Sequence, residues 1–194
     1  MARPETVIIL AAGSSSRLGQ PKQLIKSNEI PLLLKTVQAS LDAQSKNVIV
    51  VLGSNYETHK QIIKHLAVEI IYHEEWAKGM GSSLKAGLNL LLKNHPQTKT
   101  TIVTVCDQPF ISATHLCNLA DKYQETGKEI VASRYNDTFG VPALFDHSLF
   151  DELLNLEDTQ GAKALIQKHL NQVAFVDWPE GAIDIDTPDD LRFL

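Results

Sequence analysis

Short runs of aliphatic and β-branched residues alternate along this chain with segments of helical periodicity. The clearest runs are Thr6–Leu10, Asn47–Leu52, Val68–Tyr72 and Thr100–Val105. Runs this short and this apolar are typical of parallel strands that are buried on both faces. The alternation therefore predicts a three-layer, Rossmann-like α/β fold, in which helices cover both faces of a mostly parallel, twisted sheet.

The segments between these runs space their apolar residues as a helix does. We expect helices over Pro31–Gln44, His59–Leu66 and Leu84–Lys93, and a helical stripe from Leu116 to Tyr123 that ends at Gly127. The serines just before Leu84 are expected to cap the third of these helices. The C-terminal third is less regular, and its expected elements are strands at Glu129–Ser133, Ala143–Phe145 and Val173–Val176 and helices at Leu149–Leu154 and Ala162–Leu170.

Length, charge, cysteine content and apolar stretches limit the kinds of protein that this chain can be. A chain of 194 residues that is 43% hydrophobic can bury a full core, so we expect one domain over residues 1–194. A formal charge of −5 offers no basic field for a nucleic-acid partner. The two cysteines are typical of reduced cytosolic thiols. No apolar stretch resembles a leader or a membrane span, so we predict a cytoplasmic protein with no membrane partner.

The stretch LAAGSSSRLGQPK, from Leu10 to Lys22, follows the first apolar run. It fits neither the Walker A pattern nor the dinucleotide pattern G-x-G-x-x-G. Its small residues at positions 11–16 would let several backbone N–H groups converge on one anion. Arg17 and Lys22 would add two cations. The stretch is therefore a candidate phosphate-binding loop, and the alternative is a glycine-rich turn whose cations are solvated.

Asp107 follows the run Thr100–Val105, with Cys106 between them. A carboxylate at the end of a buried strand is costly unless it is solvated, paired or bound to a metal. Asp107 is therefore a candidate ligand for Mg²⁺, which prefers carboxylate, phosphate and water oxygens. The alternative is an aspartate that caps the turn before Pro109. Its neighbour Cys106 is interpreted as a small buried hydrophobic residue rather than a nucleophile.

A second acidic group lies near the C-terminus, in the stretch AIDIDTPDD. Alternation would put Asp184 and Asp186 on one face of a short strand. Thr187 and Pro188 are typical of a helix start, and the two aspartates that follow them are expected to serve as caps there. The seven histidines show no H-x-x-x-H or H-E-x-x-H pair, so we do not expect a zinc site.

Four segments together resemble the nucleotidyltransferase superfamily with a GT-A-type, nucleotide-diphospho-sugar transferase fold. They are the opening loop, the pattern W-x-x-G-M-x-S-S-L from Trp76, CDQP from Cys106 and DIDTPDD from Asp184, and they span nearly the whole chain. The form LAAG, rather than LAGG, is similar to the MobA-like molybdenum cofactor cytidylyltransferase branch. The choice of CTP over GTP therefore depends on Ala12. That branch often has an asparagine where His73 stands.

The resemblance implies a role for each matching residue. The opening loop would wrap the triphosphate, through Leu10, Ala11, Ala12, Gly13, Arg17 and Lys22. Arg17, Lys22 and Asp107 would form the catalytic set. Gly81 and Ser82 would contact the edge of the base. Asp107 and Asp186 would hold Mg²⁺, or Mn²⁺, with Asp184 in reserve as the second ligand. Gly140, Pro142 and Lys163 would border the acceptor.

The resemblance also implies the reaction. It is a Mg²⁺-dependent transfer of a nucleotidyl group from CTP, or another NTP, to the phosphate of a molybdenum-bound pterin, with release of pyrophosphate. A recipient molybdoenzyme or its chaperone would take the dinucleotide cofactor. One alternative is a nucleotidyltransferase for a sugar phosphate or another small phosphate. The other is a non-catalytic chaperone that binds the nucleotide or the molybdenum cofactor.

Overall fold

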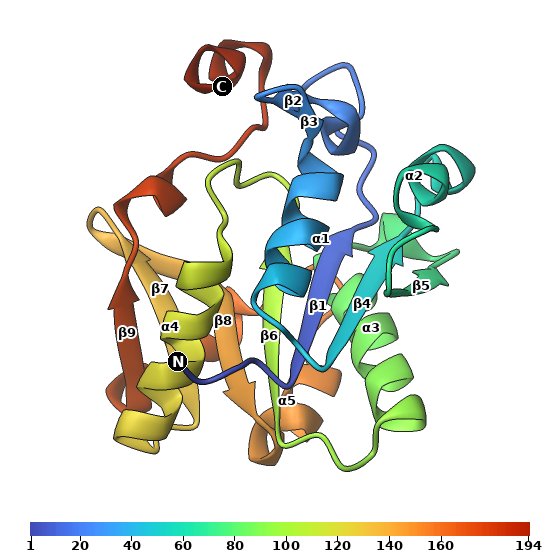
Figure 1. The fold of residues 1–194 in the computed structure, drawn as a ribbon. Helices are drawn as coiled ribbons and strands as arrows, with labels where there is room; N and C mark the ends of the chain where they lie inside the picture. Colours follow the sequence, from blue (N-terminus) through green and yellow to red (C-terminus); the bar gives the residue numbers. More distant parts are fainter.

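Seven strands form one sheet, and helices pack on both of its faces (Figure 1). The computed structural model describes residues 1–194. The strand order is β5-β4-β1-β6-β8-β7-β9. The strands are β1 (Thr6–Ala11), β4 (Asn47–Leu52), β5 (Glu69–Tyr72), β6 (Thr100–Val105), β7 (Ile130–Tyr135), β8 (Thr138–Asp146) and β9 (Val173–Asp177). A separate small hairpin pairs β2 (Lys26–Ser27) with β3 (Ile30–Pro31).

Six α-helices and six 3₁₀ segments connect the strands. The α-helices are α1 (Leu32–Asp42), α2 (Tyr56–Ile63), α3 (Met80–Asn94), α4 (Ala113–Thr126), α5 (Phe150–Leu154) and α6 (Lys163–Lys168). The 3₁₀ segments are η1 (Lys22–Leu24), η2 (Trp76–Lys78), η3 (His147–Leu149), η4 (Leu170–Gln172), η5 (Pro179–Ala182) and η6 (Pro188–Phe193). None of these helices combines the length and the apolarity that crossing a bilayer requires.

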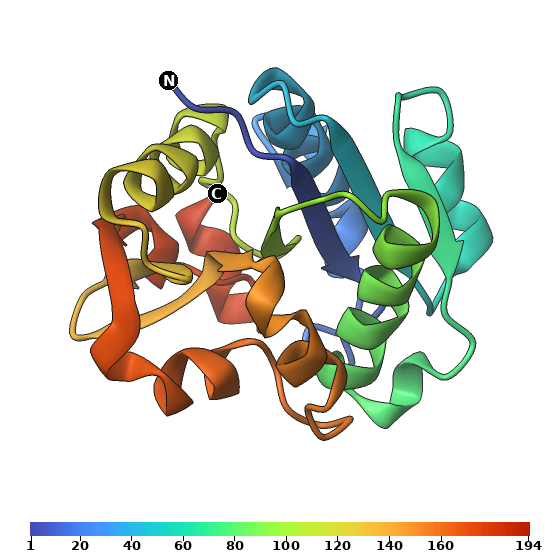
Figure 2. The same cartoon turned by 90° about the horizontal axis from the view of Figure 1, so that it is seen from below.

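The residues of β1 explain why the sheet has two covered faces. Val7 and Ile9 belong to a core cluster with α1, α2 and α4, whereas Ile8 and Leu10 belong to a second cluster with α3, α5 and α6. Figure 2 shows these two helical layers on opposite sides of the sheet. A strand buried on both faces must be apolar at every position, which is what its sequence shows.

The prediction of a mostly parallel sheet is confirmed. Neighbouring strands are parallel except at β8, which runs antiparallel to both β6 and β7. The expected short strand Ala143–Phe145 is the last part of this long strand. Its direction follows from the tight connection between Tyr135 and Thr138, because a hairpin joins antiparallel strands whereas a parallel pair needs a long crossover.

Three local expectations differ from the structure. The helix α3 begins at Met80, so Ser82 and Ser83 lie inside its first turn rather than before it, and no side chain caps it. The helix α2 begins and ends earlier than its apolar pattern predicts. Residues 183–187 form no strand, because no neighbouring strand pairs with them.

The order of the strands creates a switch point beside β1. From β1 the chain builds outward through β4 to β5 and then returns to β6 on the other side of β1. The carboxyl ends of β1 and β6 face the same edge of the sheet, at the top in Figure 1, where the C-terminal segment also lies. Ligands of open α/β sheets bind at such an edge.

Candidate active site

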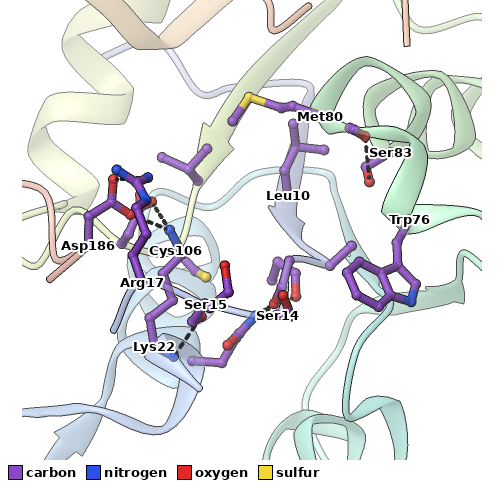
Figure 3. Close-up of a pocket in the computed structure, with 18 of the residues that line it drawn as sticks. Leu10, Ser14, Ser15, Arg17, Lys22, Trp76, Met80, Ser83, Cys106 and Asp186 are labelled. Carbon is purple, nitrogen blue, oxygen red and sulfur yellow. Dashed lines mark hydrogen bonds and ion pairs between the residues drawn. The ribbon is translucent and has the colours of Figure 1, made fainter. Parts of the chain in front are cut away.

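A cavity of about 310 Å³ opens where β1 and β6 end. Its walls are the loop after β1, the start of η1, the end of β6, the segment before α3 and one residue from the C-terminal segment. The lining residues are Leu10, Ala11, Ala12, Gly13, Ser14, Ser15, Ser16, Arg17, Lys22, Gln23, Trp76, Ala77, Gly79, Met80, Ser83, Val105, Cys106, Asp107 and Asp186. In Figure 3, Arg17 and Lys22 lie beside Asp186, and Trp76 and Ser83 lie across the cavity from them.

The loop after β1 offers unpaired backbone donors to this cavity. None of the amide N–H groups of residues 12–17 donates a hydrogen bond to another protein atom. Ser15 lies in the left-handed region with a φ of 57°, and its hydroxyl accepts a hydrogen bond from the N–H of Lys22 at 3.0 Å. A run of free amides next to two cations is the arrangement that binds polyanions.

Lys22 forms ion pairs with two carboxylates that are far apart in the sequence. Its Nζ lies 2.5 Å from Oδ2 of Asp107 and 3.0 Å from Oδ1 of Asp186. Burial by itself would lower the pKa of Lys22, but the two carboxylates, Asp107 foremost, raise it above its ordinary value. Lys22 is therefore a permanent cation at the centre of the site.

Arg17 completes the group of charges from a more open position. Its Nη2 lies 2.8 Å from Oδ2 of Asp186, and its side chain is 73% exposed, against 19% for Lys22. An exposed ion pair contributes little to folding stability. Arg17 can therefore exchange Asp186 for a bound anion at a small cost in free energy.

Asp186 reaches the cavity because the residue before it is anchored. The N–H of Ile185 donates to the backbone carbonyl of Asp107 at 2.9 Å, and the Ile185 side chain is buried with Leu18 and Leu32. The carboxylate of Asp190 accepts from the N–H groups of Asp186 and its neighbour, forming a capping box. The expected capping role of Asp190 is thus confirmed.

The carboxylates suit a metal that shares its coordination with a ligand. Oδ1 of Asp107 is buried and has no hydrogen-bond partner, and Asp186 meets the same Lys22 ammonium. No group of three or more histidine, cysteine, aspartate or glutamate side chains could hold a metal here by itself. Mg²⁺ is commonly held by one or two carboxylates plus substrate phosphates, so the donor set fits that ion.

Asp184 lies close to this group but does not line the cavity. Partial burial of its carboxyl, and then the charges of Asp107 and Asp186, raise the pKa of Asp184 to about 6. Cys106 lines the cavity with a thiol that burial keeps neutral, since its pKa is raised to about 12. This protonation agrees with the interpretation of Cys106 as a packing residue.

The two residues expected at the base, Gly81 and Ser82, are not among those that line the cavity. Gly81 packs against the backbone of residues 157–160, and Ser82 N–H donates to the carbonyl of Asp158 at 3.2 Å. The Ser82 hydroxyl lies 3.0 Å from Nε2 of His73 and donates to Gly79. Gly79, Met80 and Ser83 line the cavity instead.

The three residues expected to border the acceptor do not line this cavity. Gly140 and Pro142 lie on β8, and Lys163 begins α6, where its Nζ donates to the Thr138 hydroxyl at 3.0 Å. A Cβ on Gly140 would come within 2.3 Å of the Tyr135 hydroxyl. Burial and the charges of Asp184 and Asp107 raise the pKa of Tyr135 to about 12.

Several lining residues had no predicted role. Trp76 and Met80 belong to the pattern W-x-x-G-M-x-S-S-L, in which only Gly81 and Ser82 were given a role, yet both of these large residues line the cavity. Gln23 directly follows Lys22 and is fully buried. A polar residue that directly follows the pair Pro21–Lys22 is a signal that could have found Gln23.

Comparison with known proteins agrees with this geometry. The chain matches the MobA-like NTP transferase domain over residues 7–173. Molybdenum cofactor cytidylyltransferase of Escherichia coli is 22% identical to it, over 95% of this chain and 92% of its own length. A 2-C-methyl-D-erythritol 4-phosphate cytidylyltransferase of Shouchella clausii is 30% identical over 68% of this chain. Nicotine blue oxidoreductase of Paenarthrobacter nicotinovorans is 32% identical over 56% of it.

The chain spans 52% of the length of nicotine blue oxidoreductase and 58% of the Shouchella enzyme. Among solved structures, Rv0371c from Mycobacterium tuberculosis superposes with a TM-score of 0.84 at 28% identity, covering 100% of this chain and 98% of that one. A complex of Rv0371c with manganese gives a TM-score of 0.80 at 26% identity, covering 97% of this chain and 96% of that one. From the site, the matched range and these neighbours together, the chain belongs to the family of MobA-like NTP transferase domains.

Proposed function

We propose that this protein is a divalent-metal-dependent nucleotidyltransferase that uses CTP and the phosphate of a molybdenum-bound pterin. The observation that carries the proposal is the meeting of Lys22, Asp107 and Asp186 beside a loop of free amides. Family membership alone would not decide the reaction, because one relative is named as an oxidoreductase. The charged group favours chemistry on phosphates.

In the proposed reaction an oxygen of the acceptor phosphate attacks the α-phosphorus of CTP. A new P–O bond forms, the bond from the α-phosphorus to the bridging oxygen breaks, and pyrophosphate leaves with that electron pair. The free amides of residues 12–17 would hold the triphosphate, while Arg17 and Lys22 would offset the charge that builds up on the leaving pyrophosphate.

Asp107 and Asp186 are the residues that would hold the metal. A bound Mg²⁺ would supply charge neutralisation at the phosphate oxygens. The manganese complex of Rv0371c supports a divalent metal in this family and leaves both Mg²⁺ and Mn²⁺ as candidates. The residues of the site would position the reactants and balance their charge.

The pterin acceptor is supported by the relative that covers most of this chain, the Escherichia coli molybdenum cofactor cytidylyltransferase. Gly140, Pro142 and Lys163 would then border the pterin, and Gly81 and Ser82 would contact the edge of the base. The product would pass to a recipient molybdoenzyme or its chaperone. A sugar or polyol phosphate is the second candidate acceptor, favoured by the 30% identity to an erythritol-phosphate cytidylyltransferase.

A matrix of substrates tests the proposal. The purified protein is incubated with Mg²⁺ or Mn²⁺, each of the four NTPs, and either molybdenum-bound pterin or a panel of sugar phosphates. We expect pyrophosphate and a cytosine dinucleotide in equal amounts with CTP and the pterin. Product with a sugar phosphate alone would move the assignment to the second candidate. Nucleotide binding without pyrophosphate in any combination would contradict an enzyme and favour a binding chaperone.

A further inference from the structure

Gln23 is a fully buried polar residue that the proposed reaction does not use directly. It lies in η1, one residue after Lys22, and lines the cavity. Its Nε2 donates two hydrogen bonds, to the backbone carbonyls of Ala11 and Gly13, each at 2.9 Å. Both hydrogens of the side-chain amide are therefore bonded to the end of β1 and the loop that follows it.

These two hydrogen bonds determine how the loop presents its donors. In a trans peptide the C=O of one residue and the N–H of the next point in opposite directions. The chain has a cis peptide only at Val141–Pro142, so the rule applies here. Holding the Ala11 and Gly13 carbonyls turns the N–H groups of Ala12 and Ser14 away from Gln23, and neither N–H has a protein partner.

A backbone hydrogen bond from another segment of the chain also holds this loop. The N–H of Ser54, in the turn after β4, donates to the carbonyl of Ala12 at 2.9 Å. Three successive carbonyls are thus tied to the protein, while the amides around them remain free. A carbonyl that turned toward the cavity would replace a donor by an acceptor and would repel a phosphate.

We propose that Gln23 is a positioning residue that sets the loop after β1 for a triphosphate, an inference that rests on the proposed nucleotide site. Within this side chain only the Nε2 group can donate, and its two hydrogens serve the two carbonyls at once. Its Oε1 is buried without a partner, and the flipped amide would set that acceptor against two other acceptors. Gln23 acts through the loop and need not touch the reacting atoms.

The test compares Gln23→Met, which keeps the size and removes both donors, with Gln23→Glu, which keeps the shape and removes them. Calorimetry measures the dissociation constants of Mg²⁺–tripolyphosphate and Mg²⁺–CTP, and steady-state kinetics gives KM for CTP and for the acceptor. We expect both ligands to bind about tenfold more weakly, or worse, because the loop loses both tethers. KM for CTP rises, and KM for the acceptor stays unchanged.

Controls separate this role from a general loss of stability. Leu119→Ala removes a buried side chain of α4, away from the loop, and should lower the melting temperature without changing either dissociation constant. Gln38→Met alters an exposed glutamine of α1 and should change neither property. If Gln23→Glu does not fold, Gln23→Met decides the question.

Two negative results have different meanings. Wild-type affinities in Gln23→Met, or a loss of affinity in Leu119→Ala as large as that in Gln23→Met, would overturn the role of Gln23 and leave the proposed function intact. Wild-type protein that binds neither CTP nor tripolyphosphate would overturn the proposed function, and the inference with it.

Discussion

At the scale of single residues, the site is already balanced in charge before any ligand binds. Lys22 meets both Asp107 and Asp186, and Arg17 meets Asp186. The two cations that could bind phosphate are therefore paired with the two carboxylates that could bind a metal. A metal–nucleotide complex would satisfy both sets together under the proposed function, because its phosphates would meet the cations and its metal the carboxylates.

Replacing Lys22 should move the affinities for metal and nucleotide in opposite directions. In Lys22→Met the two carboxylates lose their partner, so Mn²⁺ without nucleotide should bind about tenfold more tightly, as monitored by electron paramagnetic resonance. CTP should bind more weakly. Lys26→Met removes an exposed lysine of β2 as the control. Unchanged Mn²⁺ affinity in Lys22→Met would count against a shared metal site.

Asp107 should be needed for turnover rather than for folding. Asp107→Ala removes one metal ligand, and we expect kcat/KM to fall by about 100-fold or more, because charge stabilisation at phosphate is lost. The exposed Asp189 provides the matched control, since Asp189→Ala should keep wild-type activity. Near-normal activity of Asp107→Ala in the pyrophosphate assay would exclude it as a ligand.

At the scale of elements, α3 lies unusually close to the sheet. A Cβ on Gly87 would come within 2.7 Å of Cγ2 of Ile8 and 2.9 Å of Cγ2 of Val51. Both partners are β-branched, fully buried and unable to move aside. The contact between α3 and the strands β1 and β4 therefore depends on a glycine in the middle of a helix.

Gly87→Ala should destabilise the protein despite the better helix propensity of alanine. Alanine gains up to about 1 kcal/mol in a helix, but overpacking costs roughly 1–3 kcal/mol. We expect a net loss of about 1 kcal/mol in the free energy of unfolding, a fall of roughly 2–4 °C in Tm. Asn89→Ala, on the exposed side of α3, should be neutral or slightly stabilising in the same calorimetric scan. A higher Tm for Gly87→Ala would show that α3 can shift.

The contact between α4 and β7 should make the protein sensitive to acid. Nε2 of His115 lies 2.7 Å from the Ser133 hydroxyl, and its ring stacks on Trp178. Burial lowers the pKa of His115 to about 4. The unfolded chain takes up this proton near pH 6.5, so the free energy of unfolding should fall as the pH drops from about 6.5 toward 4.

Urea denaturation at pH 7 and pH 5 measures this effect. His115 should account for a loss of about 2 kcal/mol between these conditions, and His115→Gln should show a correspondingly smaller loss, because it cannot titrate. Above pH 7 this histidine is neutral in both the folded and the unfolded chain, so its protonation should not affect the free energy of unfolding there. An equal pH dependence in His115→Gln and the wild type would contradict a buried neutral histidine.

At the scale of the whole molecule, the apolar runs were enough to predict the sheet and its two helical layers. The direction of β8 was not predictable from its residues, because a strand's own pattern does not say which neighbour it pairs with. Residues 183–187 alternate like a strand but have no neighbour to pair with, and Ile185 instead packs with Leu18 and Leu32. Alternation predicts a strand only where a partner exists.

The candidate site was predictable in part for the same reason. Asp107 follows a recognisable strand, so its place at the sheet edge could be inferred. The contact of Lys22 with Asp186 joins residues 164 positions apart and depends on the docking of Ile185. Gly81 and Ser82 do not line the cavity and contact residues 157–160 and His73, and their role at the base stays a prediction. Such long-range packing leaves no mark in a short motif.

The affinity for CTP with and without Mg²⁺ decides whether the loop after β1 and the two aspartates form one metal–nucleotide site. Titration calorimetry on the wild type and on Asp107→Ala gives the dissociation constants. We predict that CTP binds about tenfold more weakly, or worse, when Mg²⁺ is removed by a chelator, and that Asp107→Ala abolishes this dependence. A wild-type affinity for CTP that does not change when Mg²⁺ is removed would contradict a single metal–nucleotide site.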